Sequence, residues 1–126
     1  MKAPRNSFDH DRLEVYRVAI EFVAWVGRLL DGPLANRRLS VVGQLDRAST
    51  SIPLNIAEGN GKRSRVDRCR YLDASRGSAL ECAACLDVAV ARRVLPPDQV
   101  EEGKDLLVRI VSMLSKMVLR LGGGDT

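Results

Sequence analysis

The segment from Leu39 to Gly61 restricts the fold more than any other part of the chain. Its apolar residues recur every three or four positions, which is the spacing of one face of an α-helix. Pro53 lies inside this pattern, where it cannot donate a backbone hydrogen bond and its ring crowds the carbonyl group of Ser49, at a cost of about 3 kcal/mol. We therefore expect a helix that is kinked at Pro53 and supported by packing against other helices.

The ends of this helix and the groups around its proline can also be predicted. The Gly-Asn-Gly sequence at residues 59–61 is typical of a helix end, and Ser40 is a candidate N-terminal cap. The hydroxyl groups of the Ser-Thr-Ser sequence at residues 49–51 are close enough to take up the backbone groups that Pro53 leaves free.

Three further segments carry the same helical spacing of apolar residues. They extend from Leu13 to Leu30, from Ser64 to about Arg92, and from Pro97 or Asp98 to Leu121. Breaker sequences separate them, namely Asp-Gly-Pro at residues 31–33 and Leu-Pro-Pro at residues 95–97. Four helices joined by short connections predict an all-α fold, an up-and-down antiparallel four-helix bundle with a Pro-kinked second helix.

The composition fits one small helical domain in a reducing compartment. A chain of 126 residues has the length of a single domain, and we expect only an arm at residues 1–9 and a tail at 122–126 to be flexible. Aromatic residues make up 4% of the chain, so aliphatic side chains must build the core. Three cysteines and a start without an apolar leader predict a cytoplasmic protein, and no apolar run is long enough to cross a membrane.

Small residues dominate the middle of the third predicted helix, at residues 74–79. Gly77 lowers helix stability by up to about 1 kcal/mol relative to alanine, so we expect close approach of the second helix to compensate. At the start of the third helix, Ser64 and Asp67 resemble a capping box. These features place the second and third helices against each other.

The first predicted helix has a wider apolar face than one core requires. A second apolar row, formed by Tyr16, Ile20 and Val23 with Trp25 nearby, lies beside its main stripe. Two interpretations are open: a helix that lies deep in the bundle, or a helix that also contributes to a contact between subunits.

Residue types that often carry catalysis or metal binding form no recognisable site in this sequence. Cys82 and Cys85 have C-x-x-C spacing but fall in the middle of a helix, so we expect them to be buried packing residues. His10 is the only histidine, and we expect it to be solvated. Glu58 ends an apolar helix, so we expect it to be partly buried and paired with an arginine of the third helix. The sequence therefore predicts a protein that is not an enzyme and uses no metal or cofactor.

The strongest charge feature is a basic run at residues 62–70, in a chain with a net charge of +4. This run occupies the start of the third helix, where the helix dipole favours negative charge. Phosphate groups would be stabilised both by the basic side chains and by the free N–H groups of the helix end. A second basic stripe falls on one face of the fourth helix. The candidate nucleic-acid-binding residues are Lys62, Arg63, Arg65, Arg68, Arg70, Arg109, Lys116 and Arg120.

A specific motif adds a resemblance to a known family. The motif is Ser-Ile-Pro-Leu-Asn-Ile-Ala-Glu-Gly at residues 51–59, with Gln-Leu-Asp-Arg-Ala at 44–48, Arg-Tyr-Leu at 70–72 and Gly-Ser-Ala-Leu-Glu at 77–81. From about Leu13 to Leu121, the chain resembles the bacterial four-helix-bundle proteins first noticed as reading frames inside intervening sequences of 23S ribosomal RNA genes. The structural motif residues are Ser51, Ile52, Pro53, Asn55, Glu58 and Gly59.

The resemblance implies an antiparallel bundle that assembles into a ring-shaped homopentamer with basic surfaces. The family is related to the accessory proteins of diversity-generating retroelements, a branch that associates with nucleic acid and a reverse transcriptase. No catalytic residues are assigned in the family. The chain departs from many members at Arg76, where an aromatic or aliphatic residue is frequent, and at Glu81 and Cys82, where Leu-Glu is frequent. These departures bear on the retroelement branch rather than on the bundle.

Together, these features predict a non-enzymatic homo-oligomer that binds RNA or DNA through basic surfaces. The alternative is a scaffold or accessory subunit that contacts another protein, such as a reverse transcriptase, without touching nucleic acid. Under this alternative, the basic residues form a solvated surface or pair with acidic residues of a neighbour.

Overall fold

The computed structural model describes residues 6–122, which contain four long helices and two short 3-10 helices. The long helices are α1 (Glu14–Asp31), α2 (Ser40–Asn60), α3 (Arg65–Ala91) and α4 (Glu101–Arg120). The 3-10 helices are η1 (Asp9–Arg12), which precedes α1, and η2 (Pro97–Val100), which leads into α4. The predicted all-α fold is confirmed, and each predicted helix lies within a few residues of its observed position.

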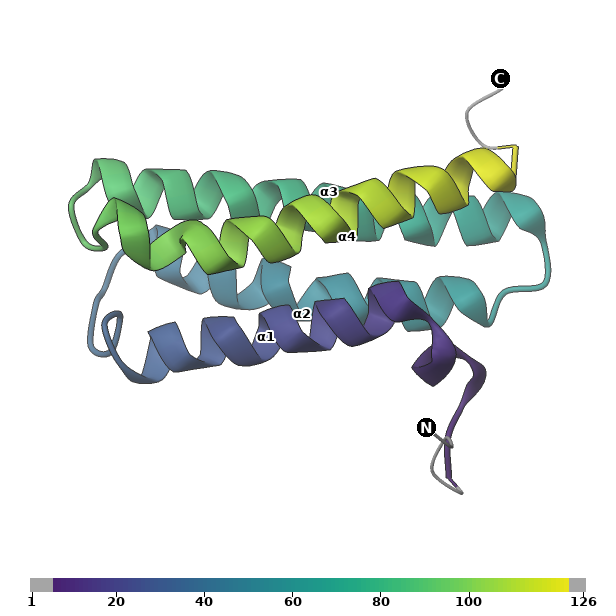
Figure 1. The fold of residues 1–126 in the computed structure, drawn as a ribbon, viewed down its shortest axis with the longest axis horizontal. Coiled ribbons are helices and arrows are strands. Elements are labelled where there is room, and N and C mark those ends of the chain that lie inside the picture. Colours follow the sequence, from purple (N-terminus) through teal and green to yellow (C-terminus); the bar gives the residue numbers. More distant parts are fainter. Residues whose placement is uncertain (1–5, 123–126) are drawn as a thin grey trace.

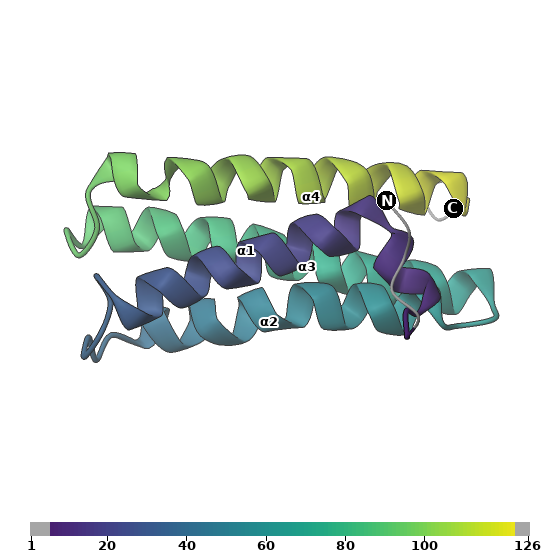
Figure 2. The same cartoon turned by 60° about the horizontal axis from the view of Figure 1, so that its bottom comes forward.

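Figures 1 and 2 show the four long helices lying side by side as a bundle. Each helix packs against two neighbours: α1 and α3 both contact α2 and α4. The α1–α2 and α3–α4 connections lie at one end of the bundle in Figure 1, and the α2–α3 connection lies at the other. The start of α1 and the end of α4 share this second end, which is referred to below as the α2–α3 end. Among residues 6–122, no helix combines the length and apolar character needed to cross a membrane.

Apolar side chains from all four helices fill the centre of the bundle. Phe22 and Trp25 of α1 stack with their ring centroids 5.7 Å apart. The Trp25 ring lies so close to Gly103 of α4 that a Cβ atom at position 103 would overlap with it. Other fully buried core residues are Val26, Leu45, Ile52, Ile56, Leu86, Leu95, Ile110 and Leu114.

Burial accounts for only part of the wide apolar face of α1. Trp25 belongs to the core, and Tyr16 and Val23 are half-buried. Ile20 is 43% exposed, so this position leaves an apolar side chain on the surface of the bundle.

The contact between α2 and α3 is the most extensive in the bundle. The Ser75 hydroxyl of α3 donates a 2.9 Å hydrogen bond to the carbonyl group of Ile52 in α2. The hydroxyl groups of Ser51 and Ser78 are also hydrogen-bonded across this contact. Within α2, the Asn55 side-chain amide donates a 2.9 Å hydrogen bond to the Ser51 carbonyl group. The prediction that small residues of α3 receive α2 is therefore confirmed.

The glycine that permits the closest approach of α2 and α3 is not the predicted one. Gly77 is exposed, and a Cβ atom there would have no neighbour within 4 Å, so its predicted packing role is wrong. At Gly59, which is buried, a Cβ atom would lie 2.9 Å from the Cβ atom of Tyr71. The reason is the rotation of α3, which turns residue 77 away from its neighbours.

Pro53 is buried within α2. The hydroxyl groups of residues 49–51 donate hydrogen bonds of 2.9 to 3.2 Å, two to the carbonyl group of Asp46 and one to that of Ala48. These hydroxyl groups therefore bind carbonyl groups of the preceding turn instead of the Ser49 carbonyl group that Pro53 leaves free, which corrects our expectation. The kink at Pro53 stays a prediction.

The helix starts match the sequence expectations in one case of two. The Ser64 hydroxyl accepts a 3.0 Å hydrogen bond from the backbone N–H of Asp67, so the predicted cap of α3 is confirmed. Ser40 is the first residue of α2 rather than its cap, because Leu39 takes the cap position with extended backbone and no side-chain hydrogen bond.

The short helix η1, which begins at the last residue of the predicted arm, packs against α1 and α2. The backbone N–H of Phe8 donates a 2.6 Å hydrogen bond to the Asp11 carboxylate, which ties together the short helix η1. The His10 ring meets the Tyr16 ring edge-on, with centroids 4.6 Å apart, and is half-buried. His10 is therefore a packing residue and not the solvated histidine that we expected. The remainder of the predicted arm, residues 1–5, and the predicted tail at residues 123–126 lie outside the described residues.

Candidate nucleic-acid interface

The two predicted groups of basic residues meet at the α2–α3 end. The basic run occupies the connection after α2 and the first turns of α3. The basic stripe of α4 approaches the same end because α4 ends there, with Arg120 as its last residue. The direction of the helices thus brings together two sequence segments that lie far apart in the chain.

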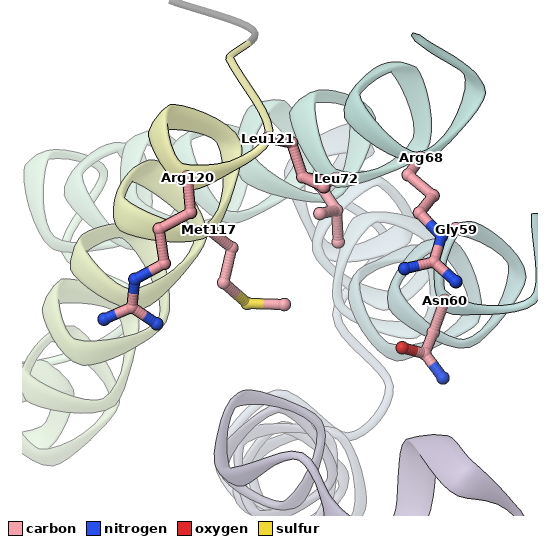
Figure 3. A pocket seen from close by; sticks show the side chains of 7 residues that line it. All are labelled: Gly59, Asn60, Arg68, Leu72, Met117, Arg120 and Leu121. Carbon is pink, nitrogen blue, oxygen red and sulfur yellow. The ribbon is translucent and has the colours of Figure 1, made fainter. Parts of the chain in front are cut away.

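A pocket of about 220 Å³ lies between these segments. In Figure 3, Arg120 and Met117 of α4 lie on one side of it, and Arg68 and Asn60 lie on the other. The complete lining consists of Gly59, Asn60, Arg68, Leu72, Met117, Arg120 and Leu121.

The position of Arg68 is set by the contact between α2 and α3. Its Nε atom donates a 2.7 Å hydrogen bond to the carbonyl group of Lys62, and its side chain is half-buried. The absence of a side chain at Gly59 lets the end of α2 approach α3 at this point, since a Cβ atom would be only 2.9 Å from the Cβ atom of Tyr71, three residues beyond Arg68. Of the Arg68 side-chain nitrogen atoms, only Nε forms a hydrogen bond among the described residues, so the terminal N–H groups can interact with a ligand in the pocket.

The pocket combines positive charge with an apolar floor. Arg68 and Arg120 both line it, and no carboxylate is among the lining residues. Within residues 6–122, neither arginine forms an ion pair. Leu72, Met117 and Leu121 make up the apolar part of the lining, which is called the apolar floor from here on. Because two guanidinium groups share one concave site without a counter-charge, an anion bound there would be stabilised.

A second hollow of about 380 Å³ adjoins the pocket between α1 and α4. Lys116 lines it, and Met117 and Arg120 line both the hollow and the pocket. Arg109 lies further along the same face of α4, where it pairs with Glu14 of α1 at 3.6 Å. The predicted basic stripe is therefore continuous with the pocket at Lys116 and Arg120, while Arg109 already has an acidic partner.

The other predicted basic residues differ in how they are engaged. Arg63 and Arg65 are exposed at the start of α3. Arg70 pairs with Asp67 at 3.7 Å, and the ammonium group of Lys62 lies 5.1 Å from the centre of the Tyr71 ring. Exposed ion pairs contribute at most about 1 kcal/mol, so phosphate groups could replace the acidic partners at little cost.

Glu58 does not have the environment that we predicted. It is exposed, and its partner is Lys62 at 3.6 Å, one turn further along the chain. The prediction of a partly buried pair with an arginine of the third helix is wrong. Glu58 lies on the outer side of α2, whereas its neighbours Ile56 and Gly59 face the bundle interior.

Cys82 and Cys85 are buried in the core, as predicted. Burial raises the pKa of the Cys82 thiol to about 12, with smaller contributions from Cys85 and Glu81. Burial, and to a lesser extent the neighbouring Glu81, also raises the pKa of the Cys85 thiol above its ordinary value of 9.0. Both thiols are therefore neutral and unreactive near pH 7. Across the described residues, no three side chains of the metal-binding types cluster together.

The structure also places basic residues together that sequence reasoning missed. Arg37, Arg38 and Arg92 surround a hollow of about 420 Å³ at the end of the bundle opposite the pocket. The arginine pairs at residues 37–38 and 92–93, each beside a helix end, were the available signal. Asn60 and Met117 of the pocket carried no such signal, because only the packing of α2, α3 and α4 brings them to one site.

Comparison with known proteins confirms the resemblance seen in the sequence. The family model described as 23S rRNA-intervening sequence protein matches residues 11–116. The chain belongs to this family.

A solved structure of a protein from a family with a related name has the same fold. It is a protein of unknown function from the S23 ribosomal protein family of Bacteroides thetaiotaomicron VPI-5482, with a TM-score of 0.77 and 24% sequence identity. The match covers 82% of this chain and 97% of that chain. At this level of identity, the likeness shows the shared helical fold alone. Among curated proteins, none matches the chain significantly.

Proposed function

We propose that this family member is a non-enzymatic oligomer that binds RNA or DNA at the α2–α3 end. The observation that carries the proposal is that Arg68 of α3 and Arg120 of α4 line the same pocket, and that no carboxylate is among its lining residues. Nucleic acids supply closely spaced phosphates, and neutralising each one with a basic side chain releases counterions, which favours binding. Exposed Arg63 and Arg65 extend the positive surface beside the pocket.

The burial and contacts of the cysteine, histidine and glutamate residues favour a binding role over catalysis. The Cys82 and Cys85 thiols are buried, and burial raises the pKa of both. His10 packs on Tyr16, and Glu58 pairs with Lys62 on the surface. Within residues 6–122, the cysteine pair, His10 and Glu58 belong to α3, η1 and α2, so they do not come together as one nucleophile–base arrangement.

The proposal is tested by measuring fluorescence anisotropy of labelled duplex DNA and structured RNA over a range of salt concentrations. We expect the logarithm of the binding constant to fall linearly with the logarithm of the salt concentration. Replacing Arg63, Arg65 and Arg120 together by glutamine should weaken binding to every sequence and reduce the magnitude of the salt slope by about 3.

Arg47→Gln provides a matched control, because Arg47 is an exposed arginine on α2 that does not line the pocket. The single control variant removes one positive charge and should leave the slope close to that of the wild type. Absence of binding at low salt, or binding that salt does not weaken, would contradict the proposal.

A protein-binding scaffold is the second candidate function, and a different observation favours it. A groove of about 360 Å³ between α3 and α4 is lined almost entirely by apolar groups. Leu80 and Val108 on its walls are 47% and 69% exposed. Such a surface suits either a second copy of the chain or another protein. A reverse transcriptase is one such partner, by analogy with the retroelement accessory proteins. Affinity for a protein partner should survive the triple arginine substitution described above.

A further inference from the structure

We infer that the pocket at the α2–α3 end accepts one unpaired nucleotide of a bound nucleic acid, with its phosphate between Arg68 and Arg120 and its base on the apolar floor. This inference rests on the proposed function and specifies which feature of a nucleic acid the protein distinguishes.

The lining has a positively charged part and an apolar part, and a regular duplex cannot contact both at once. Arg68 and Arg120 provide positive charge, and Leu72, Met117 and Leu121 provide an apolar floor. The outside of a duplex presents phosphates and sugars, while its bases stay stacked inside. A nucleotide that has left the stack presents a phosphate and an apolar base face side by side.

The size of the pocket fits a single base. Its volume of about 220 Å³ lies below the roughly 300–1,000 Å³ of sites that hold whole drug-sized ligands. The base would occupy the interior, and the phosphate would stay at the opening. Arg120 is exposed and able to adjust to the phosphate, whereas Arg68 is held in place by its hydrogen bond to Lys62.

The pocket can contact a base without an aromatic stacking platform. Its lining contains no aromatic residue, so the base face would meet aliphatic and thioether groups and the flat guanidinium groups. Asn60, which is half-buried in the lining, offers one hydrogen-bond donor group and one acceptor to the base edge. The expected preference is therefore for an unpaired nucleotide in general, with discrimination between bases depending on Asn60.

The test compares two RNA hairpins that differ by one bulged 2-aminopurine nucleotide. The wild-type protein should bind the bulged hairpin about tenfold more tightly than the fully paired hairpin. The 2-aminopurine emission should rise on binding, because the base leaves its stacked neighbours. Both measurements use the full chain.

Three variants separate the contribution of the pocket to binding from the contribution of the surrounding positive charge. Met117→Glu places a carboxylate in the pocket, where it would repel the phosphate, so this variant should abolish the preference for the bulged hairpin while weakening binding to the paired one no more than Arg63→Gln does. Arg120→Gln should reduce the preference, because it removes one of the two phosphate contacts. Arg63→Gln is the matched control: Arg63 is exposed and outside the pocket, so its loss should weaken binding to both hairpins equally. Circular dichroism confirms that each variant is folded, and Arg120→Gln, at an exposed position, serves if Met117→Glu does not fold.

The possible outcomes distinguish this inference from the proposed function. Equal wild-type affinity for both hairpins, with unchanged emission, would overturn the inference and leave general nucleic-acid binding intact. Failure to bind either hairpin would overturn both. A third arm measures adenosine monophosphate and inorganic phosphate alone: if the free nucleotide binds more tightly than the bulged hairpin, the pocket is a site for free nucleotides and the inference is wrong.

Discussion

Gly59 is both the last residue of the family motif and a lining residue of the pocket. Its lack of a side chain lets α2 end against Tyr71 and the backbone of Arg68, and the same contact brings Arg68 to the pocket. Gly77 has the same residue type within a helix but faces open space. The two glycines therefore allow a direct comparison of close packing with intrinsic helix propensity.

We predict that Gly59→Ala destabilises the protein by about 1–3 kcal/mol, because the added methyl group would force the α2–α3 contact apart. Gly77→Ala should instead stabilise it by up to about 1 kcal/mol, because alanine favours the helix and meets no obstacle. Urea unfolding followed by circular dichroism measures both changes. If the two variants had equal stability, Gly59 would have no special packing role.

Cys82 and Cys85 predict a pH dependence of stability in the alkaline range. Burial raises the pKa of Cys82 from 9.0 to about 12 and also raises that of Cys85, so the folded protein favours the neutral thiols. The unfolded chain ionises first as the pH rises. The stability that this difference contributes is therefore complete below about pH 9 and is lost progressively as the pH approaches about 12.

The measurement is urea unfolding under reducing conditions at neutral and alkaline pH. The wild type should lose stability between about pH 9 and the highest pH at which it stays folded. A Cys82→Ala and Cys85→Ala double variant should lose less over the same interval, although it is less stable at neutral pH. Ile110→Val, which also removes a buried methyl group but no thiol, is the control and should keep the wild-type dependence. An identical loss in wild type and double variant would contradict the assignment.

At the scale of the helices, the start of α3 matters both for stability and for the proposed binding of nucleic acid. The Ser64 cap fixes where the helix begins and therefore where the following arginines point. The helix dipole is unfavourable for the basic residues that follow, so the cap offsets part of this local cost. Loss of the cap should affect stability and nucleic-acid binding together.

Ser64→Ala is predicted to lower the stability by about 1 kcal/mol, because the backbone N–H of Asp67 loses its partner. Ser40→Ala replaces an exposed serine that begins α2 without capping it, and should change stability by no more than a few tenths of a kcal/mol. Thermal unfolding of both variants at the same protein concentration gives the comparison. A Ser64→Ala variant as stable as the wild type would show that the cap contributes nothing.

At the scale of the whole molecule, apolar side chains are exposed to solvent on two faces of the bundle. Ile20 of α1 is 43% exposed, and the groove between α3 and α4 exposes Leu80 and Val108. Contact between two different faces of neighbouring copies produces a closed ring when the rotation allows it. These faces support the oligomeric part of the proposed function.

We predict that the wild-type protein is larger than a monomer by light scattering after size-exclusion chromatography. Introducing Leu80→Lys and Val108→Lys together should produce a folded monomer, because two charges would have to be buried in the contact. Leu54→Lys, at a 63% exposed position of α2, is the control and should keep the wild-type mass. A monomeric wild type would contradict the proposed assembly.

The helices and several local features could be predicted because they depend on neighbouring residues in the chain. Apolar spacing located all four helices, the Ser64 cap lies where its pattern indicated, and the mid-helix cysteines are buried. The motif at residues 51–59 identified the family, which the match over residues 11–116 confirms. Hydrogen bonding within one turn and the period of a helix are local properties, so one sequence is sufficient to recognise them.

Only the tertiary structure decided which distant residues meet. The rotation of each helix turned Gly77 outward, placed Gly59 against Tyr71 and left Glu58 on the surface beside Lys62. The packing of α2, α3 and α4 brought Arg68 and Arg120 to one pocket. The sequence by itself determined the helices, the family and the presence of basic residues. Their arrangement into a site depends on helix rotation and direction, which are set by the simultaneous packing of all four apolar faces.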